Sequence, residues 1–155
     1  MYLCSRILKT LDTHQDRFCG SLSHQDIAGN LQEILKPFHV RTSVHTDNKL
    51  SSTDLAIGGE FWYDRVYQPI HLHLHFSTKS SGKFRFRDKW EDFRFLVAQV
   101  LQHELIHQHQ CQFPDHNEGI YFDMNIEDKD IHYFSELDEI DCFGHDIAME
   151  IRYYY

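Results

Sequence analysis

Five consecutive residues carry the clearest chemical signal in this chain. The segment His103-Glu104-Leu105-Ile106-His107 places two histidines four residues apart, with a glutamate directly after the first. In an α-helix, residues four apart lie one turn above each other, so both imidazoles can bind one metal ion. Glu104 would lie about 100° round the helix from His103, too far to be a good ligand but able to reach a metal-bound water. The spacing therefore predicts a metal site with Glu104 as its general base.

The motif lies in the clearest predicted helix of the chain, residues 88–109. Projected at about 100° per residue, the motif falls in the same arc as Phe93 and Val100, so it continues the apolar face of the helix. Burying a polar ring or a carboxylate is costly unless the group is paired or bound to a metal. Burial of this face therefore favours a metal site over two histidines that make only ordinary hydrogen bonds.

A catalytic zinc ion needs a third protein ligand and one position open to water. The metzincin pattern would require a glycine three residues and a histidine six residues after His107, where this chain has Gln110 and Phe113. The four cysteines form no Cys-x-x-Cys pair, so the zinc ribbon that accompanies SprT-like proteases is not expected. The remaining possibility is a glutamate on a later helix, predicted at residues 135–153, where Glu136 and Glu139 are both available.

The helical wheel of this final helix keeps both glutamates as candidates. Its expected apolar stripe consists of Leu137, Ile140, Gly144, Ile147 and Ile151. Glu136 lies near the centre of the stripe, whereas Glu139 lies at its edge, which is acceptable for a ligand that faces a neighbouring helix. Groups that could orient the two imidazoles are also present on this helix: Asp141, His145 and Asp146.

Two segments, 103–108 and 139–150, together resemble small gluzincin-like metallopeptidases, and most of all the single-domain kind common in bacteriophage genomes. In that family the second segment usually reads Glu-Ile-Asp-Ala-aromatic-Ala, and this chain has Cys142 and Gly144 where the alanines are usual. The resemblance, confined to these two predicted helices, implies that His103, His107 and Glu139 bind zinc. It also implies that Glu104 is the general base in hydrolysis of a peptide or protein substrate.

The same resemblance implies an α+β fold of the zincin type. In such a fold a small twisted antiparallel or mixed sheet packs on the motif helix, and the ligand-bearing helix follows. A length of 155 residues predicts one domain, residues 1–155. We predict a helix over residues 23–35, capped by Ser23 with Asp26, and strands over 40–44, 55–63 and 66–76, the last two forming a hairpin.

The strand at 66–76 alternates between two kinds of side chain. Ile70, Leu72, Leu74 and Phe76 alternate with His71, His73 and His75, so period-2 geometry places the aliphatic residues on one face and the histidines on the other. The three histidines could chelate a second metal, but a solvent-facing row is the preferred interpretation. We further expect this strand to form the sheet edge that pairs with an extended substrate.

The chain is acidic, with 15 Lys and Arg residues against 24 Asp and Glu residues and a net charge of −9. It therefore lacks most of the basic surface that neutralises a phosphate backbone, and no nucleic-acid partner is expected. A local exception is a basic cluster made of Lys79, Lys83, Arg85, Arg87 and Lys89. This cluster could hold an acidic peptide or a nucleic acid, although most basic loops of this kind only face solvent.

Neither a signal peptide nor a run of about 20 apolar residues is present, so no membrane association is expected. The four cysteines are then expected to be reduced thiols, and the protein to be cytoplasmic, in the host cytoplasm if a phage encodes it. The alternative to a zinc peptidase is a catalytically silent metal-binding structural or interaction protein, such as a component of a phage particle or of its assembly. The sequence does not indicate an oligomeric state.

Overall fold

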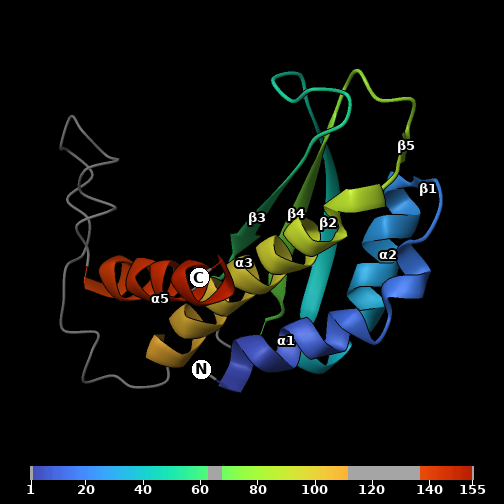
Figure 1. Cartoon of the computed structure of the whole chain (residues 1–155). Coiled ribbons are helices and arrows are strands. Elements are labelled where there is room, and N and C mark those ends of the chain that lie inside the picture. Colours follow the sequence, from blue (N-terminus) through green and yellow to red (C-terminus); the bar gives the residue numbers. More distant parts are fainter. Residues whose placement is uncertain (1, 63–67, 112–136, 155) are drawn as a thin grey trace, which may run out of the picture.

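The computed structural model describes residues 2–62, 68–111 and 137–154, and these have an α+β architecture (Figure 1). The elements follow in the order α1 (Tyr2–Asp12), β1 (Leu22–Ser23), α2 (His24–Ile34), β2 (Val40–Asp47), β3 (Leu55–Glu60), β4 (Ile70–Ser77), β5 (Lys83–Phe84), α3 (Trp90–Cys111) and α5 (Leu137–Tyr154). Short 3-10 helices at Gln15–Phe18, Lys36–Phe38 and Arg87–Lys89 join some of them.

The main sheet has three strands in the order β2-β4-β3, with β4 parallel to β2 and antiparallel to β3. The predicted alternation along β4 is confirmed, because Ile70, Leu72, Leu74 and Phe76 are fully buried. The expectation that β4 forms the sheet edge is wrong, because β2 pairs with one side of β4 and β3 with the other. Among the described strands, β3 is the edge strand that packs on α3.

Helices α2 and α3 pack on the aliphatic face of this sheet. Thr42 of β2 and Gly59 of β3 both lie beside Leu72 of β4, and so mark the same face. Thr42 Oγ1 donates a hydrogen bond of 2.9 Å to the carbonyl oxygen of Ala28 in α2, and Gly59 lies against α3. The histidines of β4 therefore lie on the face turned away from α2 and α3.

Helix α2 begins where the sequence predicts. The hydroxyl of Ser23 accepts a hydrogen bond of 3.0 Å from the backbone N–H of Asp26, which satisfies one of the free donors at the helix start. The Ser23 hydroxyl in turn donates to the Asp26 carboxylate at 2.6 Å. The helix buries Ile27, Ala28, Leu31 and Ile34 on the sheet.

Helix α1 was not predicted from the sequence. It packs on α3 and buries Ile7 and Leu11, which are four residues apart and lie on one face. Arg94 of α3 forms an ion pair of 2.9 Å with Asp12 at the end of α1. The apolar spacing of Ile7 and Leu11 was the available signal for this helix.

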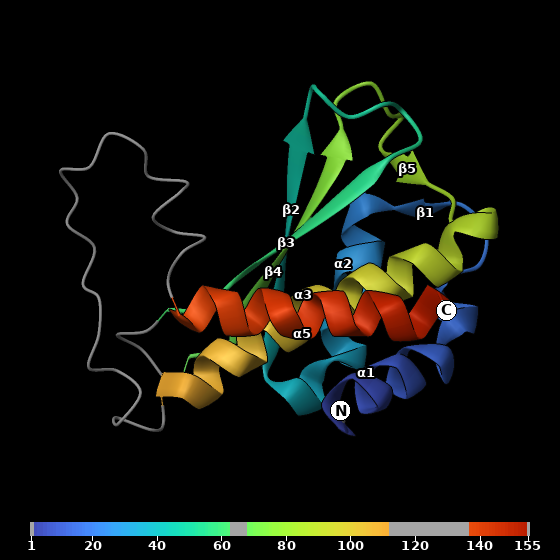
Figure 2. The ribbon, with the colours of Figure 1, turned by 60° about the vertical axis from the view of Figure 1, so that its left-hand side comes forward.

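Helix α5 lies along α3, but with a different face inward from the one expected (Figure 2). The three isoleucines of the expected apolar stripe are exposed, because Ile140, Ile147 and Ile151 have 51%, 59% and 58% of their surface accessible. The inward face instead carries Glu139, which is 4% exposed, and Cys142, which is fully buried. The stripe prediction is therefore wrong, since polar residues of α5 form paired contacts with α3 and can be buried at low cost.

Candidate metal centre

The two motif histidines lie side by side in the carboxyl-terminal half of α3. Their Nε2 atoms are 3.1 Å apart, and the side chains of His103 and His107 are only 13% and 5% exposed. The helical spacing accounts for this arrangement, because residues four apart project from one face of a helix. The two imidazoles are therefore able to bind one ion, as the spacing predicts.

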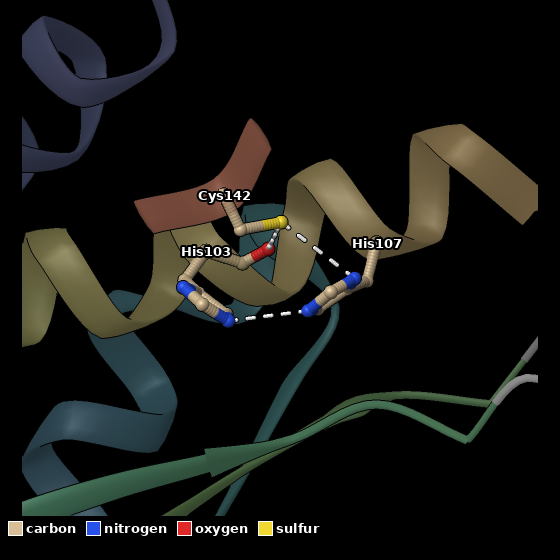
Figure 3. Close-up of side chains that lie close together, drawn as sticks. All are labelled: His103, His107 and Cys142. Atoms are coloured by element: carbon tan, nitrogen blue, oxygen red, sulfur yellow. Dashed lines mark hydrogen bonds between the residues drawn. The ribbon is translucent and has the colours of Figure 1, made fainter. Parts of the chain in front are cut away.

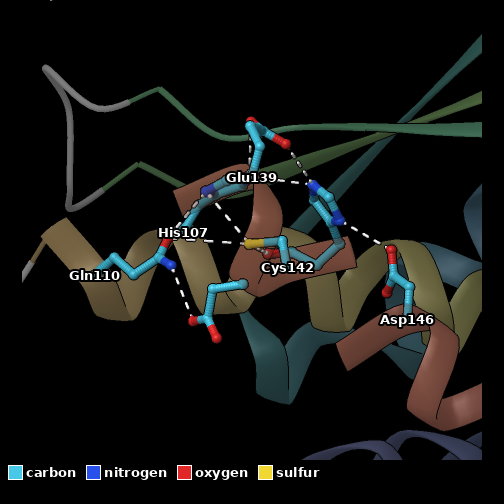
Figure 4. A network of polar contacts seen from close by, with 7 residues as sticks. His107, Gln110, Glu139, Cys142 and Asp146 are labelled. Carbon is cyan, nitrogen blue, oxygen red and sulfur yellow. Dashed lines mark hydrogen bonds and ion pairs between the residues drawn. The ribbon is translucent and has the colours of Figure 1, made fainter. Parts of the chain in front are cut away.

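Glu139 places one carboxylate oxygen near each of the two Nε2 atoms. Its Oε2 atom lies 3.5 Å from His103 Nε2, and its Oε1 atom lies 3.3 Å from His107 Nε2 (Figure 4). A tetrahedral zinc ion with bonds of about 2.0–2.1 Å separates its ligand atoms by about 3.3 Å, and each of these contacts is close to that spacing. The structure brings together three of the predicted site residues, although they come from helices joined by a long segment.

The opposite ring nitrogens of the two histidines have their own partners. His103 Nδ1 lies 3.0 Å from a carboxylate oxygen of Asp146, and His107 Nδ1 lies 3.1 Å from the side-chain oxygen of Gln110. The side-chain nitrogen of Gln110 donates to Asp141 at 3.3 Å. With a metal bound, both Nδ1 atoms would carry the hydrogen toward these acceptors, and both Nε2 lone pairs would be available to the ion. Such outer partners are typical of metal-binding histidines.

Two of these outer partners are predictable from the sequence and one is not. Asp146 and Asp141 were candidates and do support the histidines, Asp141 through Gln110. Gln110 itself was considered only as evidence against a metzincin, although its position three residues after His107 on the same helix was a usable signal. His145 lies 3.8 Å from Asp141 on the exposed side of α5. Glu136, the alternative third ligand, lies outside the described residues.

The cluster has a strong affinity for positive charge. Burial by itself would lower the pKa of His103, but the hydrogen bonds to Asp146 and Glu139 outweigh it and raise that pKa to about 10. Without a metal, the site therefore holds a proton on His103 at neutral pH. A divalent cation would take the place of that proton, because metal ions bind the neutral imidazole.

Glu104 lies beneath the edge strand β3. It is buried, and this burial raises the pKa of its carboxyl group. A Cβ atom added to Gly59 would lie 2.6 Å from Glu104 Cγ and Oε1 and 2.7 Å from Val100 Cγ1. Only a glycine at this position leaves room for the Glu104 side chain between α3 and β3.

The close contact at Gly59 leads to a test with a matched control. We expect Gly59→Ala to displace Glu104 and to destabilise the protein by about 1–3 kcal/mol, as overpacking does. Gly58→Ala is the control, because a Cβ atom there would meet nothing within 4 Å. Urea unfolding of both variants measures the difference, and equal stability would contradict the tight packing of Glu104 on β3.

Cys142 is a further potential ligand that the sequence did not suggest (Figure 3). His103, His107 and Cys142 form a buried group able to hold a metal ion, with donor atoms within 4.8 Å of one another. The thiol, however, contacts His107 at Nδ1, at a distance of 3.6 Å, and this is the nitrogen that also faces Gln110. Burial and the neighbouring carboxylates raise the pKa of Cys142, which disfavours the thiolate form that binds metals. The set of His103, His107 and Glu139, with contacts of 3.1, 3.3 and 3.5 Å, is therefore the tighter donor set.

The basic cluster lies apart from this centre, on β5 and the segment that leads into α3. Lys83, Arg85, Arg87 and Lys89 line a polar cleft there together with serine and threonine side chains. Lys89 donates to the carbonyl oxygen of Thr53 at 2.8 Å and pairs with Asp54 at 3.2 Å. At least one of these cations is therefore engaged within the chain.

No protein-family profile, curated protein or solved structure matches this chain. Among the helices that the structure describes, none combines the length and the apolar character needed to cross a bilayer.

Proposed function

We propose that the chain is a zinc-dependent metallopeptidase with a zincin-like, gluzincin type of centre. The observation that supports this most strongly is the convergence of His103, His107 and Glu139: the two Nε2 atoms are 3.1 Å apart, and a different carboxylate oxygen lies 3.3 Å from His107 Nε2 and 3.5 Å from His103 Nε2. Two imidazole nitrogens and one carboxylate are the donor set of a catalytic zinc site that keeps a position open to water. The helical spacing of His103 and His107 and the tertiary contact of Glu139 with both rings thus support the same zinc site.

Zinc in such a site supplies Lewis acidity, which lowers the pKa of water to about 7 and polarises a carbonyl oxygen. In our proposal, Glu104 accepts a proton from the attacking water and returns it to the amine that leaves. A raised pKa suits this role, because a base with a pKa closer to the working pH both accepts and returns the proton efficiently. Asp146 orients the His103 ring through its Nδ1 atom, and Gln110 orients the His107 ring in the same way.

The edge strand β3 is the place where an extended peptide would lie. Among the described strands β3 pairs only with β4, and Gly59 packs directly on Glu104. A peptide that adds as a further strand would gain backbone hydrogen bonds from β3 and bring its scissile bond near Glu104. This assignment replaces β4, which lies in the middle of the sheet.

Removal and return of the metal tests the proposal. We expect the protein as purified with zinc to contain one zinc ion per chain and to cleave fluorescein-labelled casein. Dialysis against 1,10-phenanthroline should abolish cleavage, and Zn²⁺ but not Mg²⁺ should restore it, because Mg²⁺ prefers six oxygen ligands. Cleavage that survives complete removal of the metal would overturn the proposal.

A second candidate is a protein that keeps the metal only as a structural staple. The buried group of His103, His107 and Cys142 favours it, because a thiolate is a common ligand of structural zinc sites. X-ray absorption at the zinc edge separates the candidates. One sulfur ligand supports the staple, whereas a shell of nitrogen and oxygen alone supports the peptidase.

A further inference from the structure

The face of the sheet turned away from α2 and α3 brings histidines of two strands together. In the parallel pair of β2 and β4, Ser43 lies beside His73, and His45 beside His75. His45 Nε2 and His73 Nδ1 are 3.1 Å apart, and the Ser43 hydroxyl lies 2.8 Å from each. The histidines expected as a row on one strand thus form their closest contact across two strands.

A carboxylate fixes the orientation of one of these rings. Glu60 of β3 lies 3.3 Å from His73 Nε2, so that nitrogen is the donor of the ring and Nδ1 presents its lone pair toward His45. A carboxylate behind a histidine is a common support of metal-binding imidazoles. The side chains of His73 and Glu60 are 24% and 45% exposed, so an ion from solvent can reach the pair.

We propose that His45 and His73 form a second metal site, for a late first-row divalent ion such as Cu²⁺, Ni²⁺ or Zn²⁺. The N···N separation of 3.1 Å is close to the ligand spacing of about 3.3 Å in a tetrahedral zinc site. Imidazole nitrogens suit these ions in particular. Water fills the remaining positions, so this site binds its ion less tightly than the candidate metal centre.

This second site is separate from the candidate metal centre. Gly58 of β3 lies beside His73, whereas Gly59, the next residue, lies against Glu104 on the opposite face of the sheet. The ring of His75 stacks on that of His45 with a centroid distance of 5.0 Å, so a third imidazole lies beside the pair on this face. The net charge of −9 also favours cation binding. The inference does not depend on the proposed peptidase activity.

Zinc titration by isothermal calorimetry tests the site. We expect the metal-free wild-type protein to bind two Zn²⁺ ions, one tightly and one more weakly. His45→Ala and His73→Ala should each weaken the second event at least 10-fold and leave the tight event unchanged. Glu60→Gln, which keeps the shape but removes the charge behind His73, should weaken it by about 10-fold. His103→Ala should remove only the tight event.

His71→Ala is the matched control, because His71 lies on the same face of β4 but its ring centroid is 6.4 Å from that of His73. It should leave the second event unchanged. Circular dichroism of each variant checks that the sheet remains folded. The proposal is overturned if the wild-type protein shows no second event. It is equally overturned if that event persists in His45→Ala, or if His71→Ala weakens it as much as His73→Ala does.

Discussion

Replacing Glu104 with glutamine is expected to lower the turnover number for casein by about 10²–10⁴-fold, the usual contribution of a general base. The substitution keeps the shape of a side chain that packs tightly against Gly59, so the fold should be retained. Glutamine cannot accept the proton of the attacking water. Because Glu104 is not one of the three converging donors, the zinc content should stay at one ion per chain.

Two measurements are needed for this variant. Casein cleavage of the zinc-loaded wild-type and Glu104→Gln proteins gives the ratio of turnover numbers, and atomic absorption gives the zinc content of the same samples. Unchanged turnover at full zinc occupancy would refute the role of Glu104 as the base. Loss of zinc would instead place Glu104 among the ligands.

Removal of the third ligand is the other large expected effect. Glu139→Ala takes away the carboxylate that lies 3.3 Å from His107 Nε2 and 3.5 Å from His103 Nε2. We expect zinc affinity to fall by more than about 100-fold, beyond the 10–100-fold that loss of an outer partner costs. Competition with a fluorescent zinc chelator measures this change.

Cys142→Ala is the matched control, because Cys142 lies on the same inward face of α5, one turn after Glu139. Since its thiol contacts His107 at Nδ1, which also faces Gln110, we expect its loss to change zinc affinity only a few-fold. Glu136→Ala should leave affinity unchanged. If Cys142→Ala or Glu136→Ala weakened zinc binding more than Glu139→Ala does, the ligand assignment would be wrong.

Local patterns predicted several elements of this fold well. The start of α2 follows from one capping residue, Ser23, because a helix end depends on contacts within its first turn. The faces of β4 follow from alternation alone, since a strand projects successive side chains to opposite sides. The pairing of His103 with His107 likewise requires only helical geometry. All three features depend on residues no more than a few positions apart.

The inward face of α5 could not be read from its apolar residues. A helical wheel assumes that the apolar side faces the core, but Ile140, Ile147 and Ile151 are exposed. Glu139 and Asp146 are turned inward because α3 supplies His103 and His107 as partners. Burial of a polar group depends on whether a partner is present, and a distant helix provides that partner.

The sequence by itself therefore determined the motif, its helix and the two-faced central strand, because each results from backbone periodicity over short distances. It did not determine which strand forms the edge, which face of α5 meets α3, or that His45 and His73 would meet across the sheet. Those features result from strand order and helix docking, which bring together residues from separate parts of the chain. The candidate metal centre depends on both kinds of feature: helical spacing brings two of its ligands together, and the packing of α5 on α3 supplies the third.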